Sequence, residues 1–242
     1  MNQPNNPFAG DLAGSTAIVT GASRGFGRGI AAALTAAGAH VVGVARTGGD
    51  VTADAADPAT ATRLIDEYQP RTVVLCAGAA PQMSPLQDQT WESFSQNWNV
   101  DVAQAFHWIR DALRRPLAPG SRVIAVSSGA AIKGSPLSGG YAGAKATVRL
   151  ITDYAALESE RAGLGIDFVS VLPALTPTTE LGAKAVAAYA ERQGVDIDTF
   201  VQSLQPALTA EQVGKSVLEI ATGERRDHRA YTLSAAGLSP LG

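Results

Sequence analysis

Two residues of this sequence have the types and the spacing that acid–base chemistry needs. Tyr141 and Lys145 are four positions apart at the start of a helical segment, so both side chains lie on one face of the helix. A phenol, with a pKa near 10, is a weak acid at neutral pH, but a nearby ammonium group favours its ionised form. We therefore expect Tyr141 to exchange a proton with a substrate oxygen and Lys145 to activate it. The alternative is an incidental pair on a helix surface.

A glycine-rich loop is the second feature that points to chemistry. Residues 20–28 read Thr-Gly-Ala-Ser-Arg-Gly-Phe-Gly-Arg and lie between a β-branched segment and a helical one. Gly21, Gly25 and Gly27 let the backbone turn sharply and approach a ligand closely. The helix that follows directs its free N–H groups at an anion, and a diphosphate fits that environment. The alternative is a tight turn in which the glycines serve packing only.

The elements that would position these residues follow from the hydrophobic pattern. Short β-branched runs without alternation are typical of strands buried on both faces of a parallel sheet. These runs cover residues 16–19, 40–44, 72–75, 122–126 and 166–172. Segments with helical character lie between them or follow them, at residues 30–37, 59–68, 90–113, 144–157 and 209–221, with Thr90 and Thr209 as helix caps.

The alternation of strand and helix predicts an α/β fold with a single Rossmann-type, doubly wound parallel sheet flanked by helices. Such sheets bind ligands at the carboxyl ends of their strands, which is where the glycine loop falls. We expect one catalytic domain over residues 1–242, with a flexible tail at 1–11. Residues 175–206 are too long for an ordinary connection and predict a substrate lid.

Composition excludes several classes of protein. Apolar residues make up 45% and charged residues 17%, which is ordinary for a globular chain and excludes disorder and collagen-like order. The net charge of −3 has the wrong sign to attract nucleic acid. Without a secretory signal or a long apolar stretch, and with Cys76 as the one cysteine, we expect a cytoplasmic protein with no membrane contact. The three histidines are too far apart for a metal motif, so no metal site is predicted.

The Gly-x3-Gly-x-Gly spacing after Thr20 resembles that of the short-chain dehydrogenase/reductase family, and the resemblance extends over residues 12–233. It implies a nicotinamide dinucleotide bound along the carboxyl edge of the sheet, with Ser23, Arg24 and Phe26 beside the three glycines. It also implies a small-molecule carbonyl or alcohol substrate. A homodimer or homotetramer is implied as well, formed through the helix at 90–113 and the Tyr141 helix.

The second strand indicates which dinucleotide is bound. Family members that prefer NAD carry an acidic residue at its end, whereas this chain has Ala45 followed by Arg46. Arg46 and Arg24 would flank a 2′-phosphate, so NADP(H) is favoured over NAD(H). Only four residues separate Arg46 from a short strand at 51–54, where the family usually places a helix. Asp54 resembles the aspartate that approaches the adenine amino group.

Two further turns resemble family motifs with altered residues. Cys76, Ala77 and Gly78 resemble the end of an Asn-Asn-Ala-Gly turn in which cysteine replaces the key asparagine. The segment 173–178, with Pro173, Thr176 and Thr178, resembles the Pro-Gly-x3-Thr turn around the nicotinamide carboxamide. Its Ala174 replaces glycine and would be strained at a positive φ.

The remaining catalytic residues are implied by spacing within the resemblance. Ser128 stands thirteen residues before Tyr141 and resembles the serine that polarises the substrate carbonyl, with Ser127 as the rival. Asn99, 42 residues before Tyr141, resembles the asparagine that kinks its helix and anchors a water in a proton relay to the lysine. The alternative for Asn99 is a polar residue that happens to lie in mid-helix.

These features predict an NADP(H)-dependent oxidoreductase that interconverts a carbonyl and a secondary alcohol by hydride transfer, with Tyr141 as acid and base. The altered turns at Cys76 and Ala174 motivate an alternative, a catalytically silent NADP(H)-sensing protein of the same fold. A 3-oxoacyl-thioester reductase is a second alternative. Epimerisation or dehydration is a third, although the chain lacks the extra substrate domain that such relatives carry.

Overall fold

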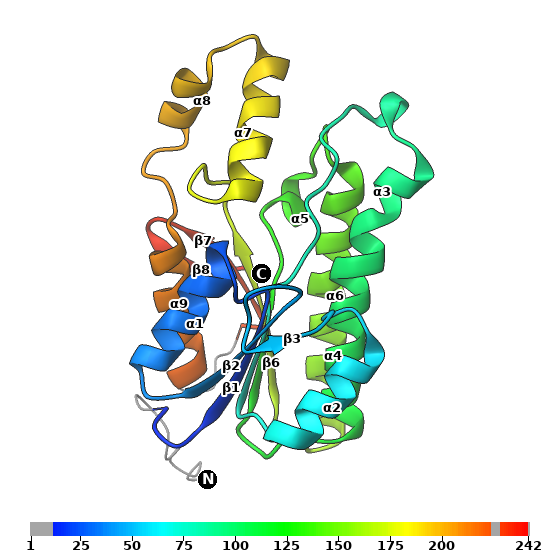
Figure 1. Cartoon of the computed structure of the whole chain (residues 1–242), viewed down its shortest axis with the longest axis vertical. Coiled ribbons are helices and arrows are strands. Elements are labelled where there is room, and N and C mark those ends of the chain that lie inside the picture. The colour runs from blue at the N-terminus through cyan, green and yellow to red at the C-terminus, as the bar shows by residue number, and fades with distance from the viewer. Residues whose placement is uncertain (1–11, 224–227, 242) are drawn as a thin grey trace.

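An eight-stranded sheet runs through the part of the chain that the computed structural model describes, residues 12–223 and 228–241 (Figure 1). The strand order is β3-β2-β1-β4-β5-β6-β7-β8, and neighbours are parallel except for β7 and β8. The strands are β1 (Thr16–Thr20), β2 (His40–Ala45), β3 (Val51–Thr52), β4 (Thr72–Leu75), β5 (Arg122–Val126), β6 (Asp167–Pro173), β7 (Ala230–Ser234) and β8 (Gly237–Pro240). The predicted doubly wound parallel sheet is confirmed.

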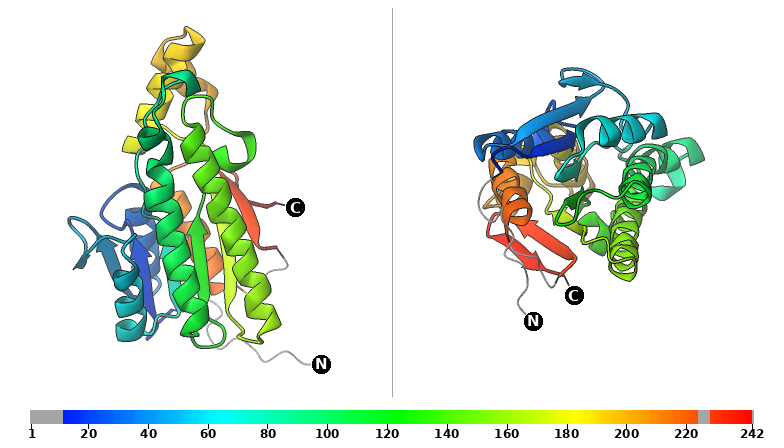
Figure 2. Two further views of the ribbon diagram at one scale, coloured as in Figure 1. Left: turned by 90° about the vertical axis from the view of Figure 1, so that its right-hand side faces the viewer. Right: turned by 90° about the horizontal axis from the view of Figure 1, so that it is seen from below.

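The helices differ from the predicted segments in several places, and two of the differences concern the site. They are α1 (Gly25–Ala36), α2 (Pro58–Tyr68), α3 (Trp91–Asn97), α4 (Ala103–Arg114), α5 (Ala130–Lys133), α6 (Gly139–Arg161), α7 (Glu180–Gln193), α8 (Ile197–Ser203) and α9 (Ala210–Thr222), with a 3₁₀ turn η1 (Leu86–Asp88). The helix expected at 90–113 is interrupted by a π-helical turn, η2 (Trp98–Val102). The segment expected to be a lid contains α7 and α8, which stand beyond the carboxyl edge of the sheet (Figures 1 and 2).

Threonine caps set two of the helix starts. The side chain of Thr90 accepts a hydrogen bond from the backbone N–H of Ser93, and Thr209 does the same for Gln212. In both cases the third helical residue bonds back to the cap, which completes a capping box. Both caps are those predicted from the sequence.

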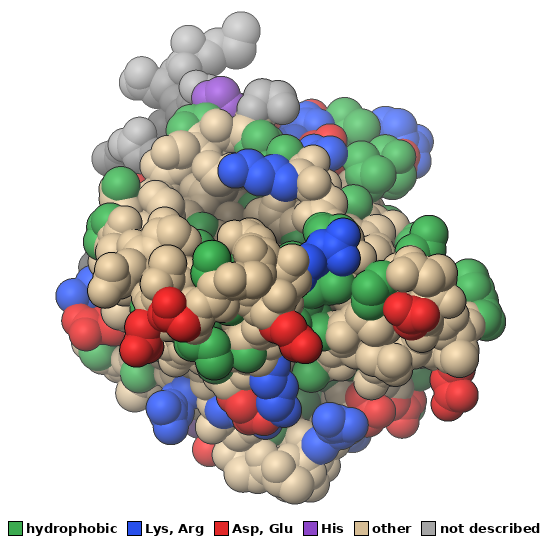
Figure 3. All heavy atoms as spheres, turned by 90° about the horizontal axis from the view of Figure 1, so that it is seen from above, with side chains coloured by type: hydrophobic (Ala, Val, Ile, Leu, Met, Phe, Trp, Pro, Cys, Tyr) green, Lys and Arg blue, Asp and Glu red, His purple; other side chains and the backbone are tan. Residues whose placement is uncertain are grey.

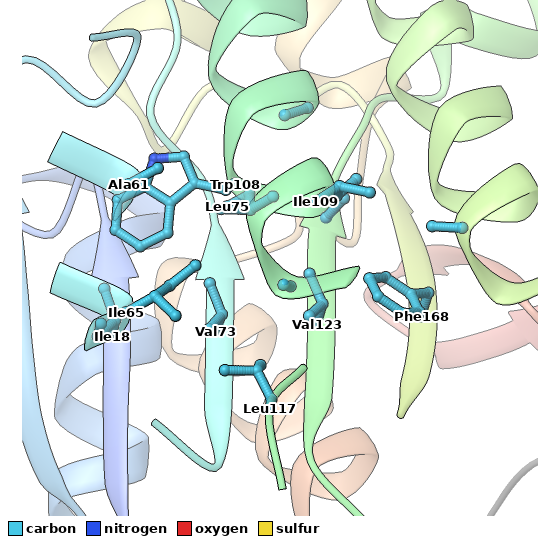
Figure 4. Close-up of a cluster of buried hydrophobic side chains, with 14 of the residues drawn as sticks. Ile18, Ala61, Ile65, Val73, Leu75, Trp108, Ile109, Leu117, Val123 and Phe168 are labelled. Carbon is cyan, nitrogen blue, oxygen red and sulfur yellow. The ribbon is translucent and has the colours of Figure 1, made fainter. Parts of the chain in front are cut away.

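Apolar side chains cover each face of the sheet. Helices α2, α4 and α6 pack on one face, and α1 and α9 pack on the other. Trp108 of α4 is fully buried on the first face and donates its indole N–H to the carbonyl of Ala55 at 3.0 Å (Figure 4). On the second face α1 and α9 approach so closely that a Cβ on Gly29 would lie 2.2 Å from the carbonyl oxygen of Ala210.

The connection from β2 to β3 contains no helix, as the sequence predicts. Instead, the carboxylate of Asp50 accepts a hydrogen bond from the backbone N–H of Gly43 at 2.8 Å. This bond satisfies a donor of β2 beside the short strand β3. The adenine side of a ligand at this edge would therefore meet a short loop.

The surface above the carboxyl edge carries basic and acidic side chains side by side (Figure 3). Within the described residues, no helix combines the length and the apolar character needed to cross a bilayer. The same residues contain no group of three or more His, Cys, Asp or Glu side chains arranged to hold a metal ion.

Candidate active site

The glycine loop lies where the strand order reverses. From β1 the chain continues to β2 on one side, and from β4 it continues to β5 on the other, so the loops after β1 and β4 meet at a switch point. Gly21 has φ +70°, and a Cβ there would lie 2.8 Å from Cα of Ala77. Only glycine permits this close approach of the two loops.

The rest of the loop opens α1 toward the same edge. Gly25 has φ +53° and begins α1, while a Cβ on Gly27 would lie 2.1 Å from the carbonyl oxygen of Gly21. Packing therefore requires glycine at 21 and 27. The first N–H groups of α1 still have no partner within the helix, and Arg24 at its N-cap makes no capping bond with its side chain. Ser23 and Phe26 are half-buried beside them.

The turn after β4 is held by two residues that the sequence analysis did not single out. The hydroxyl of Thr20 accepts hydrogen bonds from the backbone N–H groups of Cys76 at 2.9 Å and Ala77 at 3.2 Å. It donates to the side-chain oxygen of Gln104, and the Gln104 amide donates to the carbonyl of Ala77 at 2.8 Å. Thr20 and Gln104 together supply the donors and acceptors that the thiol of Cys76 lacks. The only sequence signal was Thr20 directly before the glycines.

The thiol of Cys76 is not a reactive group in this environment. Burial raises its pKa to about 11, although the nearby Lys145 acts in the opposite direction. A thiol with so high a pKa stays protonated at neutral pH. Cys76 is therefore a packing residue of the turn.

Tyr141, Lys145 and Ser128 are brought together. Nζ of Lys145 lies 5.8 Å from the centre of the Tyr141 ring, on the same face of α6. Ser128, just beyond β5, lies close enough to Tyr141 for its hydroxyl to lower the pKa of the phenol, and it accepts a hydrogen bond from the backbone N–H of Ala130 at 3.2 Å. Ser127 instead donates its hydroxyl to the carbonyl of Lys145 at 2.7 Å and is buried, so it serves the backbone.

Opposing effects act on the pKa of the Tyr141 phenol. Burial is the largest effect and raises the pKa of Tyr141. Lys145 and the hydrogen bond with Ser128 lower this pKa, whereas Asp101 and Cys76 raise it. The net result is a pKa above the ordinary value of a tyrosine. For Lys145, burial acts to lower the pKa, but Asp101 and Tyr141 together raise it above its ordinary value, so its ammonium group stays charged.

The structure does not bring Asn99 into this cluster, which corrects the expectation from spacing. Asn97 and Asp101 are four residues apart and share the buried face of the helix. Asn99 lies midway between them in the sequence, so it points away from that face and is exposed. The side chain of this helix that reaches Lys145 is Asp101, whose Oδ1 lies 2.9 Å from Nζ. The predicted kink is present nearby as the π turn η2.

The expected dinucleotide residues on the adenosine side lie at the surface. Arg46 follows β2 and is exposed, while Ala45 is buried. Arg24 is exposed as well, but it forms an ion pair with Glu180 at the start of α7, at 2.7 Å. Asp54 is exposed, and its carboxylate accepts a hydrogen bond from the backbone N–H of Ala56 at 2.9 Å.

The segment after β6 departs from the expectation of strain. Among the described residues, Gln69 is the one non-glycine residue with a positive φ, so Ala174 adopts an ordinary backbone conformation. Its N–H donates to the carbonyl of Leu233 at 2.8 Å, next to the end of β6 at the buried Pro173. The hydroxyls of Thr176 and Thr178 both donate to the carbonyl of Leu208, at 2.5 Å and 2.9 Å. Thr176 is buried and Thr178 is exposed.

The segment that contains α7 and α8 is joined to the residues that precede α6. The hydroxyl of Tyr189 on α7 hydrogen-bonds that of Ser135, which in turn lies 2.6 Å from the hydroxyl of Ser138. The Tyr189 ring stacks on Phe200 of α8 with centroids 6.3 Å apart. These contacts hold α7 and α8 beside the start of the helix that carries Tyr141.

Comparisons with known proteins identify relatives of this chain. A family model described as enoyl-(acyl carrier protein) reductase matches residues 21–225. The chain is 30% identical to the L-xylulose reductase of Mesocricetus auratus over 61% of this chain and 66% of that protein. It is 27% identical to the carbonyl reductase [NADPH] 2 of Sus scrofa, over 80% of this chain and 88% of that protein.

Solved structures show the same architecture. A short-chain dehydrogenase of Burkholderia cenocepacia in complex with NADP has a TM-score of 0.77 at 25% identity, over 92% of this chain and 97% of that one. A putative NAD(P)-dependent gluconate 5-dehydrogenase of Beutenbergia cavernae with bound NADP has a TM-score of 0.73 at 25% identity, over 87% and 90%.

Proposed function

The chain belongs to the short-chain dehydrogenase/reductase family of NAD(P)-dependent oxidoreductases, and on that premise we propose that Tyr141 is the acid and base for interconversion of a carbonyl and a secondary alcohol. The observation that carries this proposal is the cluster of Ser128, Tyr141 and Lys145 beside the carboxyl edge of the sheet. A cation close to a phenol favours the phenolate, and Lys145 acts in that direction on Tyr141 against the effect of burial.

Each side chain has a separate task in the proposed reaction. Ser128 donates a hydrogen bond to the substrate oxygen and stabilises the negative charge that develops on it during reduction. Tyr141 delivers the proton to that oxygen, or removes it when an alcohol is oxidised. Lys145 keeps its charge and stabilises the phenolate that Tyr141 becomes.

The residues of the edge fit a nicotinamide dinucleotide. Glycine at position 21 lets the loop pack against the turn at Ala77, and glycine at position 27 lets α1 pack against the carbonyl of Gly21. The N-terminus of α1 offers N–H groups to a diphosphate. When bound, the dinucleotide supplies or accepts the hydride. Thr176 and Thr178 both bond the carbonyl of Leu208, and we assign Thr178 to the carboxamide side because it is exposed whereas Thr176 is buried.

We favour NADP(H) over NAD(H) because of the end of β2. Ala45 offers no carboxylate to a ribose hydroxyl, and Arg46 is exposed directly after it. A guanidinium group at that place suits a 2′-phosphate. Two relatives support this preference, a carbonyl reductase named for NADPH and a short-chain dehydrogenase solved with NADP.

The two features that motivated a silent binding protein carry less weight in the structure. The Cys76 turn is held by Thr20 and Gln104, and Ala174 has no backbone strain. A working cofactor edge therefore does not require the family's own residues at these two positions. We favour an active enzyme.

We propose that two copies associate through α4 and α6. These helices expose Phe106, Leu150, Tyr154 and Leu157, with 48%, 38%, 57% and 49% of each side chain accessible. Apolar residues gathered on one helical face are typical of an interface. Light scattering of the purified chain should give the mass of a dimer or tetramer, and Leu157→Glu should shift it toward the monomer.

Turnover of the wild-type protein tests the proposed function. Consumption of NADPH and of NADH is measured with four classes of substrate: simple ketones and aldehydes, ketose sugars, 3-oxoacyl thioesters and enoyl thioesters. We expect carbonyl reduction with NADPH as the better donor. Reduction of enoyl thioesters alone, or dinucleotide binding without turnover of any class, contradicts the proposal.

A further inference from the structure

A buried carboxylate lies where three segments meet beneath the proposed catalytic tyrosine. Asp101 belongs to the π turn η2, and only 1% of its surface is accessible. Its neighbours are the segment after β4, which passes through Gly78 and Ala79, and the helix α6 at Lys145. Burying a carboxylate is costly unless it is paired and hydrogen-bonded, so its partners matter.

Every partner of Asp101 that the structure gives is a donor or a cation. Oδ2 accepts hydrogen bonds from the backbone N–H of Ala79 at 3.0 Å and from Nδ2 of Asn97 at 3.1 Å. Oδ1 lies 2.9 Å from Nζ of Lys145. An ionised carboxylate accepts on both oxygens and suits all three, whereas an amide at this position would turn its NH₂ group toward a donor.

The surrounding chain leaves room for this carboxylate and for little else. A Cβ on Gly78 would lie 2.7 Å from Oδ1, so glycine is required where the turn passes over it. Nδ2 of Asn97 also donates to the carbonyl of Ala79 at 2.7 Å, which fixes the second donor. The position of Oδ1 relative to Lys145 is therefore set by the backbone on both sides.

Lys145 is held at two points by these contacts. Besides the ion pair with Asp101, Nζ donates to the carbonyl of Val126 at 3.0 Å, and 8% of the lysine side chain is accessible. An ammonium group has three protons, so one is left for the phenol or for a ligand. Without Asp101, the carbonyl of Val126 would be the remaining one of these two partners, and the ammonium group would be buried without a counter-charge.

We propose that Asp101 is a positioning residue that fixes Lys145 beneath Tyr141 and offsets part of its charge, so that it sets the pH at which Tyr141 exchanges its proton. This inference rests on the proposed role of Tyr141. The carboxylate holds the lysine in place and, at the same time, weakens the attraction that the lysine exerts on the phenolate.

The groups that face Tyr141 support this direction. Lys145 from α6 lowers the pKa of Tyr141, whereas Asp101 from η2 and Cys76 after β4 raise it. The Cys76 thiol has a pKa raised to about 11 by burial and is neutral near pH 7. Asp101 is thus the carboxylate that opposes the effect of Lys145 on the phenol.

The test is the pH dependence of alcohol oxidation by the full chain with saturating NADP. The variant Asp101→Asn removes the charge at nearly constant shape, and Asp101→Ser removes it in a smaller side chain. We expect the pH midpoint at which kcat/KM rises to move downward by about one unit in both variants, with a lower kcat.

The matched control is Asp66→Asn, which removes the carboxylate of an exposed ion pair with Arg115 at 2.8 Å. A midpoint that does not move in the two Asp101 variants, moves upward, or moves equally in Asp66→Asn overturns the inference. If neither Asp101 variant folds, the double variant Asp101→Asn with Lys145→Met should fold, because it leaves no unpaired charge in the buried site. A double variant that also fails to fold overturns the inference. Inactivity of the wild type instead contradicts the proposed function.

Discussion

Nη1 of Arg24 lies 2.7 Å from Oε2 of Glu180, so the glycine loop and the first turn of α7 are joined by an ion pair. Both side chains are largely exposed, at 69% and 59%, so the pair adds little to stability. Its position is more informative, because Arg24 is also one of the two residues expected to meet a 2′-phosphate. The carboxylate of Glu180 and the phosphate would then share one guanidinium group.

Removing that carboxylate should affect the two dinucleotides differently. In Glu180→Gln we expect NADPH to bind about two- to fivefold more tightly, because the guanidinium group of Arg24 then interacts with the 2′-phosphate alone. Such a change corresponds to a binding free energy of under about 1 kcal/mol, which is typical of an exposed ion pair. NADH binding should be unchanged. Fluorescence titration of both dinucleotides measures this, with Glu191→Gln on the same helix as the control. Equal changes for NADPH and NADH contradict the shared guanidinium.

Arg46 provides a stronger test of the dinucleotide preference. Hydrogen bonds to charged groups contribute about 1.5 to 3 kcal/mol, so Arg46→Ala should weaken NADPH binding about ten- to a hundredfold and leave NADH binding almost unaffected. Arg63→Ala, an exposed arginine of α2, is the control. If NADPH binding survives the loss of Arg46, the 2′-phosphate is held elsewhere.

The Thr20 hydroxyl should matter for both stability and dinucleotide binding. Thr20→Val leaves the N–H groups of Cys76 and Ala77 and the side chain of Gln104 without this partner, in a fully buried site. We expect a loss of about 1 to 3 kcal/mol in the free energy of unfolding, together with weaker NADPH binding. Chemical denaturation and titration measure the two effects.

A matched threonine is available as the control for that variant. The hydroxyl of Thr152 is equally buried, but it bonds the carbonyl of Val148 within the same helix. Thr152→Val should therefore cost less stability and leave NADPH binding unchanged. If Thr20→Val behaves like Thr152→Val, then Thr20 does not hold the turn.

Cys76 should resist thiol reagents in the folded protein. Because burial raises its pKa to about 11, the reactive thiolate is scarce below that pH and increases only as the pH rises toward it. We expect very slow modification at pH 7 to 8 and a rapid reaction after unfolding in denaturant. Rapid labelling of the native protein at pH 7 is the result that argues against the buried, protonated thiol.

The sequence predicted the sheet well because its strands are buried on both faces. An uninterrupted β-branched run such as 122–126 is typical of a strand that is buried on both faces of a sheet. Strand β5 has the same bounds. The cluster of Tyr141 and Lys145 was predictable for a related reason, since an i,i+4 spacing on one helix needs no knowledge of distant contacts.

Features that depend on helix irregularity or on distant pairs were not predictable in the same way. Asn99 was chosen by its sequence separation from Tyr141 alone, and because the π turn η2 departs from the 3.6-residue period, the helical pattern could not show that Asp101 is the residue that reaches Lys145. The bond between Thr20 and Gln104 joins residues 84 positions apart, which no local pattern reveals. The strain expected at Ala174 was absent because the turn after β6 adopts another backbone conformation.

The central claim is that Tyr141 exchanges the proton with the substrate oxygen, and Tyr141→Phe tests it most directly. Tyr154→Phe, an exposed tyrosine on the same helix, is the matched control. With saturating NADPH and the best carbonyl substrate of the panel, we expect kcat to fall about a hundred- to ten-thousandfold in Tyr141→Phe and to stay unchanged in Tyr154→Phe, with NADPH binding retained. Equal kcat values for Tyr141→Phe and the wild type would contradict the account.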